Sequence, residues 1–393
     1  MKIAVFAKST TLHKNYGGLE TQNRALCEEL TKRGHEITIF SPKRDFEGND
    51  AFVNGVKYVF IDAEYGNYLL SSLKKNSWIK KSLEVFEEFH RNEKFDLVLG
   101  QSSAAESIIE NKRNLDIKTA SISHGTALSE LITFFKNISG IKDIYWLLRN
   151  TQYFLRQYFG RQRRFVLHSD VVIAVSNYVK KSLMSETFVD DKKVKVIHNG
   201  VDGSLFKNEK TEKDRKHTDI YFIGRVEKSK GIITIIKMMK DINRDVKLHV
   251  VGDGPCLEEA KKKAEDLNIK DRIIFYGKMP HYEFIKKISP DIFVFPTKRI
   301  EGFPMVLVES MFFGIPVVAF DMGGVSDAVE NGKNGFLIES GNVSLFKEKL
   351  VELIDDKTLR SDMGNYAKEK AEKEFTIGKM IDAYEKVFLD ILK

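Results

Sequence analysis

Residues 292–313 read IFVFPTKRIEGFPMVLVESMFF and contain one complete strand, loop and helix. The first four residues are apolar, and Pro296, which has no backbone N–H, ends the strand that they predict. A polar loop then leads to Glu301, and an apolar helix is expected directly after Pro304. A buried strand followed by a loop and a helix is the unit from which parallel sheets are built, so this stretch predicts an α/β fold.

The same alternation continues along the chain in both directions, and thirteen apolar runs read as strands. A single sheet of that width would be unusual. The polar, charged segment 202–218 divides the runs into two sets, so we expect two sheets, each with a crevice at the carboxyl ends of its strands. The predicted strands are Ile3–Phe6, Ile37–Phe40, Val56–Ile61, Asp96–Leu99, Thr119–Ile122, Val171–Val175, Val194–Ile197, Ile220–Ile223, Lys247–Val251, Ile273–Tyr276, Ile292–Phe295, Val317–Phe320 and Gly335–Ile338.

We therefore predict two Rossmann-like, parallel-sheet domains that face each other across a cleft, where chemistry is expected. The first domain is placed at residues 1–203 and the second at residues 204–375. A last helix at 376–393 follows a break in the pattern.

Composition excludes several classes of protein. The chain has 393 residues, of which 42% are hydrophobic, so it can bury a core without staples. Two cysteines, Cys27 and Cys256, exclude a disulfide scaffold and a cysteine-rich zinc module. No apolar run approaches the roughly 20 residues of a membrane-spanning helix, and residues 1–7 are too short for a signal-peptide core, so a cytoplasmic protein is expected. The net charge of +7 favours anionic partners, although a lysine-rich surface also serves solubility alone.

Two loops between a strand and a helix carry groups that bind phosphate. Gly224 and Arg225 end the eighth predicted strand, and Lys230 follows five residues later. A guanidinium and an ammonium in one loop can converge on a diphosphate, and a solvated basic loop is the alternative. Gly17 and Gly18 precede a helix, where they either leave N–H groups aimed at an anion or form a plain turn.

Carboxylates near a helix start indicate a site for hydroxyl groups. Glu301 stands just before the predicted helix, Glu309 lies within it, and the loop at Gly302 and Phe303 exposes N–H groups at the positive helix end. The apolar neighbours disfavour a simple surface role for Glu309, because an unpaired buried carboxylate is costly. His124 follows the fifth predicted strand, where it either faces the cleft or serves as a structural donor.

Ten short motifs occur in a fixed order along the chain. They are GGLE at 17–20, RGHE at 33–36, SHG at 123–125, VS at 175–176, HNGVD at 198–202, GR with KG at 224–231, GDGP at 252–255, residues 301–309, GG at 323–324 and GKNGF at 332–336. Each is weak alone, but the ordered set resembles the family 4 retaining glycosyltransferases of the GT-B fold. The resemblance implies that the first domain binds the acceptor, the second binds a nucleotide sugar, and the last helix crosses back to the first domain.

The resemblance also implies roles for single residues. Arg225 and Lys230 would hold the donor diphosphate and stabilise the leaving nucleoside diphosphate, Glu301 would bind the transferred sugar, and Glu309 would bind the ribose. His124 would face the sugar or the acceptor, and it completes an expected catalytic set with Arg225, Lys230 and Glu301. The expected donor-binding set is Gly17, Gly18, Gly224, Arg225, Lys230, Met279, Glu301, Gly302, Phe303, Pro304, Met305, Val306 and Glu309.

The activity that the resemblance implies is transfer of a hexose, with retention, from a UDP- or GDP-linked sugar to a glycan or a lipid-linked acceptor in cell-surface glycan synthesis. The nucleotide sugar is a substrate, and no cofactor is expected. No Asp-x-Asp occurs in the chain, so no metal site is expected, in keeping with the family's metal-independent habit. Front-face attack, in which a donor phosphate oxygen takes the acceptor proton, is adopted as a hypothesis.

Other functions remain as alternatives. A nucleotide-sugar epimerase of the same architecture would also hold a nucleoside diphosphate, but it needs flanking acid and base residues, for which only His124 is a clear candidate. A nicotinamide oxidoreductase would need a complete Gly-x-Gly-x-x-Gly, which segment 252–255 does not supply. A nucleic-acid binder rests on charge alone, and nucleic acid is not expected as a partner.

Segments 68–83 and 131–166 alternate basic and aromatic residues. This composition suits a peripheral helix lying on an anionic membrane surface, here the inner face of the cell membrane. Packing of the aromatic side chains as an ordinary core, or stacking on single-stranded nucleic acid, is the alternative.

Overall fold

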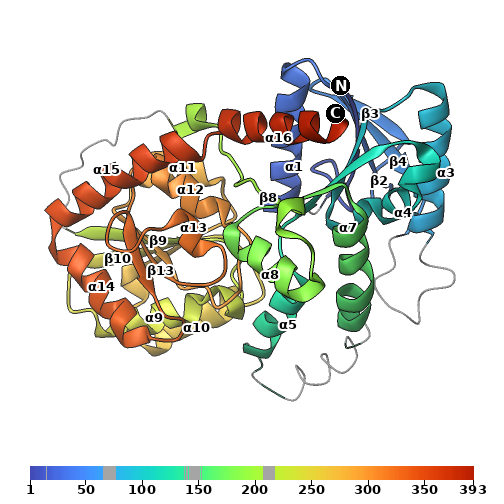
Figure 1. The fold of residues 1–393 in the computed structure, drawn as a ribbon. Helices are drawn as coiled ribbons and strands as arrows, with labels where there is room; N and C mark the ends of the chain where they lie inside the picture. Colours follow the sequence, from blue (N-terminus) through green and yellow to red (C-terminus); the bar gives the residue numbers. More distant parts are fainter. Residues whose placement is uncertain are drawn as a thin grey trace. The chain divides into compact units, whose positions relative to one another are not determined.

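The computed structural model describes residues 1–14, 16–64, 77–136, 138, 140, 151, 153–206 and 217–393. The chain forms two compact units. Unit 1 comprises residues 1–131, 138–199 and 377–393, and unit 2 comprises residues 132–137 and 200–376. Each unit has one sheet, built mainly from parallel strands that alternate with helices along the chain (Figure 1). The predicted class of two parallel-sheet α/β domains is confirmed.

The sheet of unit 1 has eight strands in the order β3-β4-β2-β1-β5-β6-β7-β8, and only the edge pair β3–β4 is antiparallel. The strands are β1 (Lys2–Phe6), β2 (Glu36–Pro42), β3 (Asp50–Val53), β4 (Val56–Ile61), β5 (Leu97–Gln101), β6 (Lys118–Ser123), β7 (Val171–Ala174) and β8 (Val194–Val196). The helices are α1 (Gly18–Lys32), α3 (Trp78–Asn92), α4 (Glu106–Leu115), α7 (Arg163–His168), α8 (Asn177–Thr187) and α16 (Ile377–Leu392), with a π-helical turn η2 (Arg156–Gln162) before α7. Helix α5 (Ala127–Lys136) begins in unit 1, and its residues from Ile132 onward are assigned to unit 2.

Unit 2 has six strands in the order β11-β10-β9-β12-β13-β14, and all its pairs are parallel. The strands are β9 (Thr218–Ile223), β10 (Val246–Val251), β11 (Ile273–Gly277), β12 (Ile292–Phe295), β13 (Val317–Phe320) and β14 (Gly335–Ile338). The helices are α9 (Ile232–Asp241), α10 (Leu257–Asp266), α11 (His281–Ile288), α12 (Met305–Phe312), α13 (Val325–Ala328), α14 (Val343–Asp355) and α15 (Lys357–Glu374). The strand order reverses between β9 and β12, and ligands of open α/β sheets bind at such a switch point.

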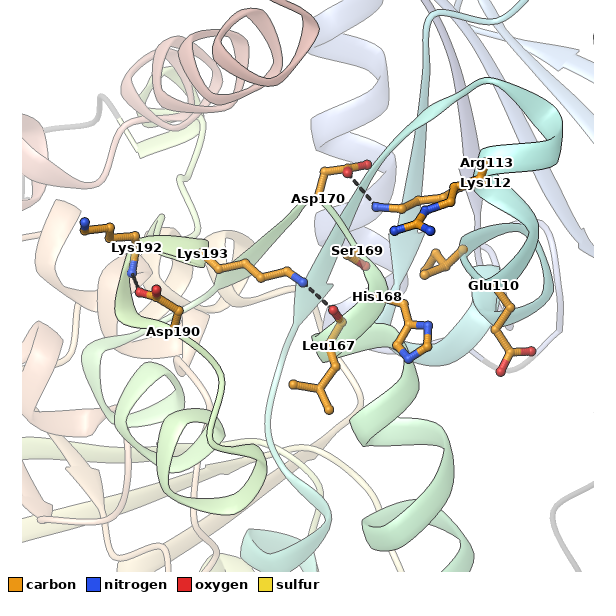
Figure 2. A pocket seen from close by; sticks show the side chains of 11 residues that line it. Glu110, Lys112, Arg113, Leu167, His168, Ser169, Asp170, Asp190, Lys192 and Lys193 are labelled. Carbon is orange, nitrogen blue, oxygen red and sulfur yellow. Dashed lines mark hydrogen bonds and ion pairs between the residues drawn. The ribbon is translucent and has the colours of Figure 1, made fainter.

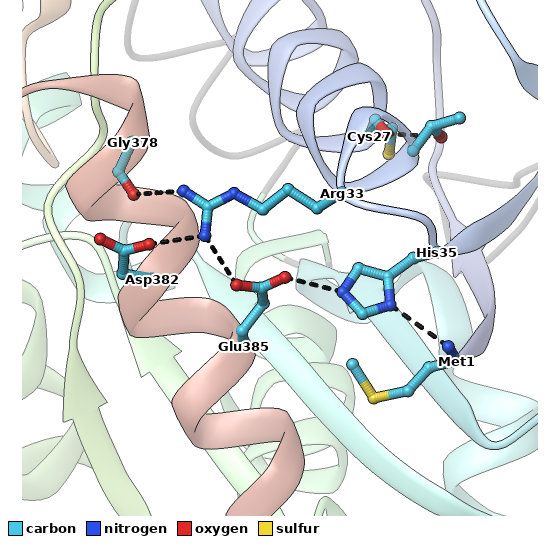
Figure 3. Close-up of polar contacts among 8 residues, drawn as sticks. Met1, Cys27, Arg33, His35, Gly378, Asp382 and Glu385 are labelled. Carbon is cyan, nitrogen blue, oxygen red and sulfur yellow. Dashed lines mark hydrogen bonds and ion pairs between the residues drawn. The ribbon is translucent and has the colours of Figure 1, made fainter.

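The last helix, α16, belongs to unit 1 and packs against α1. Arg33, at the end of α1, donates from its guanidinium to Asp382 at 2.5 Å and to Glu385 at 2.7 Å (Figure 3). Glu385 also lies 2.8 Å from Nε2 of His35. The expected return of the last helix to the first domain is therefore confirmed, and the RGHE motif supplies the side chains that hold it.

The two segments proposed to meet a membrane are described only in part, because residues 68–76 and 141–150 lie outside the described ranges. Trp78 is 1% exposed, and its indole N–H donates to the carbonyl of Ala104 at 2.9 Å, so this side chain belongs to the core alternative. Phe159, by contrast, is 68% exposed. Within the described ranges, no helix is both long and apolar enough to cross a membrane. Membrane contact stays a prediction.

Candidate functional site

The loop after β9 lies at the switch point of unit 2 and is fastened to the loop after β12. The carbonyl of Ser229 accepts a hydrogen bond from the backbone N–H of Lys298 at 2.7 Å. Gly231 has φ = 77°, and a Cβ there would lie 2.0 Å from the carbonyl oxygen of Pro296, so only glycine fits. The two loops therefore pack closely against each other at the carboxyl ends of the neighbouring strands β9 and β12, where the topology predicts a ligand.

The packing of these two loops brings two predicted site residues, Lys230 and Glu301, into contact. The Lys230 ammonium donates to Oε1 of Glu301 at 2.6 Å, and the side chains of the two residues are 21% and 13% exposed. The hydroxyl of Thr297, which is fully buried, donates to the same carboxylate oxygen at 3.1 Å. The Arg225 side chain instead is 70% exposed and lies 3.4 Å from Glu227.

The segment from Gly302 to Glu309 leads from the loop after β12 into helix α12. Pro304 caps α12, and the backbone of Glu301 is held by a bridge to Gly323. Glu309, in the second turn of the helix, lies with Oε2 at 2.6 Å from Nδ1 of His281. Of the other predicted donor-binding residues, Gly302, Met305, Val306 and Met279 are half-buried, and Phe303 and Pro304 are buried.

The remaining predicted residues belong to unit 1. His124 follows β6, and its Nε2 lies 2.7 Å from the side-chain oxygen of Gln101, whose amide N–H donates to Asn23 at 2.6 Å. Nε2 must therefore carry the ring proton, which leaves Nδ1 as an acceptor. Burial lowers the pKa of His124 to about 4, so the ring is neutral at pH 7. Gly17 caps α1, and its N–H donates to the Glu20 carboxylate at 2.9 Å.

Sequence reasoning missed the side chains that hold these groups, namely Thr297, His281 and Gln101. Thr297 and Gln101 stand at the carboxyl ends of buried strands, and that position was the available signal. Sequence reasoning also left open the role of the GDGP segment, residues 252–255, which the structure shows. Asp253 accepts a hydrogen bond through its carbonyl from the N–H of Val226 at 3.0 Å, so the segment packs against the loop after β9.

A cavity of about 830 Å³ in unit 1 is lined by none of the predicted residues. Figure 2 shows Lys112 paired with Asp170, and Lys193 donating to the Leu167 carbonyl. Asp170 and Lys193 immediately precede β7 and β8, so the cavity lies at the amino ends of the strands. Ligands of this fold class bind at the opposite edge, at the carboxyl ends.

Two parallel-sheet units, with a lysine and a carboxylate in contact at the switch point of unit 2, fit the class of GT-B glycosyltransferases. The model of "Glycosyltransferase Family 4" matches residues 16–205, and that of "Glycosyl transferases group 1" matches residues 204–370. The chain belongs to this glycosyltransferase family, and it is a glycosyltransferase.

Individual proteins agree with this assignment. An uncharacterized glycosyltransferase of Methanocaldococcus jannaschii is 27% identical over 95% of this chain and 94% of its own. The Escherichia coli UDP-Gal:α-D-GlcNAc-diphosphoundecaprenol α-1,3-galactosyltransferase is 30% identical over 56% of this chain and 60% of its own. The structure of Anabaena HepE in complex with UDP has a TM-score of 0.73 at 17% identity, covering 99% of this chain and all of the other, which shows the same fold.

Proposed function

We propose that this chain is a retaining, metal-independent hexosyltransferase that uses a UDP- or GDP-sugar and acts on a glycan or a lipid-linked acceptor in cell-surface glycan synthesis. The observation that carries the proposal is the 2.6 Å contact between Lys230 and Glu301 at the switch point of unit 2. It sets a cation for a diphosphate beside a carboxylate for sugar hydroxyls. The similarity to a transferase that takes UDP-Gal and a diphosphoundecaprenol-linked acceptor supports these donor and acceptor classes.

The chemistry follows from the charges. As the bond between the anomeric carbon and the phosphate oxygen breaks, negative charge grows on the leaving nucleoside diphosphate, and Arg225 and Lys230 offset it. The acceptor oxygen bonds the anomeric carbon from the face that the diphosphate leaves, which retains configuration, and the acceptor proton passes to a phosphate oxygen. Glu301 orients the sugar hydroxyls, and the neutral His124 accepts a hydrogen bond from the sugar or the acceptor.

The remaining assignments concern nucleotide binding. Glu309 accepts from the ribose hydroxyls, and Gly17 and Gly18 let the amino-terminal loop approach the diphosphate closely. The backbone of Met279 contacts the base. Met305, Val306 and their neighbours present N–H groups at the start of α12.

A panel of UDP-, GDP- and ADP-sugars in a thermal-shift assay tests the donor class, because a bound ligand stabilises the folded state by mass action. With the donor found, Arg225→Ala and Lys230→Ala are each expected to lower kcat by orders of magnitude. Arg244→Ala is the matched control. Arg244 also pairs with a carboxylate, that of Asp355, but it lies just before β10, at the amino ends of the strands of the same sheet. Turnover near that of the wild type in both loop variants would contradict the proposal, and an inverted anomer in the product would contradict retention.

A further inference from the structure

A buried histidine of unit 2 contacts the carboxylate assigned to the ribose. His281 begins α11 and is 7% exposed, and its Nδ1 lies 2.6 Å from Oε2 of Glu309. Its Nε2 lies 3.1 Å from the hydroxyl of Tyr221, which is 2.7 Å from Oγ of Ser310. Tyr221 is fully buried in β9 and stacks on Phe293. The imidazole is therefore held by the core on one side and meets the candidate site on the other.

The directions of the hydrogen bonds make His281 a donor to Glu309. An ionised carboxylate only accepts, so Nδ1 carries a proton. If Ser310 donates to Tyr221, then Tyr221 donates to Nε2 and the ring is neutral. If Ser310 instead donates to the carbonyl of Val306, which lies at 2.6 Å, then Tyr221 donates to Ser310 and Nε2 donates to Tyr221. Both arrangements keep an N–H at Nδ1 aimed at Glu309.

The carboxylate of Glu309 keeps room for a ligand. The Glu309 side chain is 25% exposed, and among the described residues His281 is the only one with a hydrogen bond or ion pair to it in the structure. One oxygen, Oε2, is thus held by His281, and the other has no hydrogen bond or ion pair from a described residue. A carboxylate held in one rotamer loses less conformational freedom on binding, which strengthens its hydrogen bonds to a ligand.

We propose that His281 is a positioning residue that sets Glu309 to accept the ribose hydroxyls of the donor nucleotide. The inference rests on the proposed function, because it takes the ligand of Glu309 to be a ribose. His281 follows Met279 by two residues. One short segment would thus contact the base through Met279 and align the ribose-binding carboxylate through His281.

Two substitutions separate this role from packing. His281→Asn places an amide N–H at the position of Nδ1 and retains the donor to Glu309. His281→Gln places the amide at the position of Nε2, which keeps the contact with Tyr221 but removes that donor. His249→Asn is the matched control, because His249 is 3% exposed and its Nε2 lies 2.7 Å from a carboxylate, Asp219, while its Nδ1 lies 3.0 Å from a tyrosine hydroxyl, Tyr276. An asparagine there removes the contact with the carboxylate and keeps the one with the tyrosine, as His281→Gln does.

The measurement is calorimetric binding of UDP and GDP and, for the nucleotide that binds, of its 2′,3′-dideoxy analogue. We expect His281→Gln and Glu309→Gln each to weaken binding of the ribonucleotide about tenfold, as loss of one charge-assisted hydrogen bond implies. Both should leave binding of the dideoxy analogue within about twofold. We expect His281→Asn to restore most of the loss, and the double variant to lose no more than Glu309→Gln alone.

The other outcomes are distinguishable. Equal weakening of both nucleotides by His281→Gln, or no weakening of either, overturns the role of His281 while Glu309→Gln still reports on the ribose. Weaker binding of the ribonucleotide but not of the dideoxy analogue in His249→Asn also overturns the role of His281, because a general change in packing would then be the cause. If Glu309→Gln leaves the ribonucleotide unaffected, or if the wild type binds neither UDP nor GDP, the ribose assignment itself fails and the inference fails with it.

Discussion

The pH dependence of stability tests the environment of His124. Burial lowers its pKa from the ordinary value of 6.5 to about 4. Between these values the unfolded chain binds a proton that the folded chain does not, so stability is complete above pH 6.5 and falls as the pH drops towards 4. For a shift of this size, the loss between pH 7.5 and pH 5 is about 2 kcal/mol.

His124→Gln isolates this contribution. An amide nitrogen at the position of Nε2 retains the donor to Gln101 and does not titrate. Groups that titrate in the same range cancel in the comparison, among them His90, whose pKa is also lowered by burial. Urea unfolding at pH 7.5 and pH 5 can be followed by tryptophan fluorescence, since Trp78 is buried in unit 1, the unit that contains His124. The wild type should lose about 2 kcal/mol more than the variant, and equal losses would refute a lowered pKa of His124.

Three further predictions concern the contact between α1 and α16, the loop after β9 and metal ions. Arg33→Ala removes the ion pairs with Asp382 and Glu385. We expect this variant to destabilise unit 1 by about 1 kcal/mol in urea unfolding, and by less at high salt. A loss of stability that does not change with salt would contradict an ionic origin. In Gly231→Ala the new methyl group meets the carbonyl of Pro296, so we expect the free energy of unfolding to fall by more than roughly 2 kcal/mol and kcat to fall at least tenfold. Gly332→Ala is the control, because Gly332 has φ = 79° and open space around it. It should lower the free energy of unfolding by about 1 kcal/mol and leave turnover unchanged. Chelation with EDTA should leave the initial rate unchanged, and a rate restored only by added Mg²⁺ or Mn²⁺ would contradict a metal-independent reaction.

Local patterns predicted most of the sheets. The run 292–295, closed by Pro296, is a strand with the bounds that were predicted. Strand β3 was missed because its apolar run, Ala51–Val53, has only three residues, and their side chains are exposed or half-buried. It pairs antiparallel with β4 across Asn54 and Gly55, which both have positive φ. An Asn-Gly pair between two strands is a hairpin signal, and it was the information available in the sequence.

The candidate site also contains residues that local sequence predicts and residues that it does not. Glu301 and Glu309 could be predicted because a strand, a loop and a helix place them without reference to the rest of the chain. Their partners could not. His281 meets Glu309 across 28 residues and Tyr221 across 60, and both contacts depend on which strands become neighbours. Strand order is a property of the whole sheet, so no local pattern reports it.

The two carboxylates differ in the kind of group that holds them, and this difference has a consequence for binding. Glu301 is paired with the cation of Lys230, the same cation that a diphosphate would attract, so a bound diphosphate competes with Glu301 for Lys230 and frees acceptor capacity on the carboxylate for sugar hydroxyls. Glu309 is held by His281, a buried side chain that the proposed function does not assign to the diphosphate. A nucleoside diphosphate would therefore find its ribose contact already formed, while the sugar contact becomes available only as the diphosphate engages Lys230.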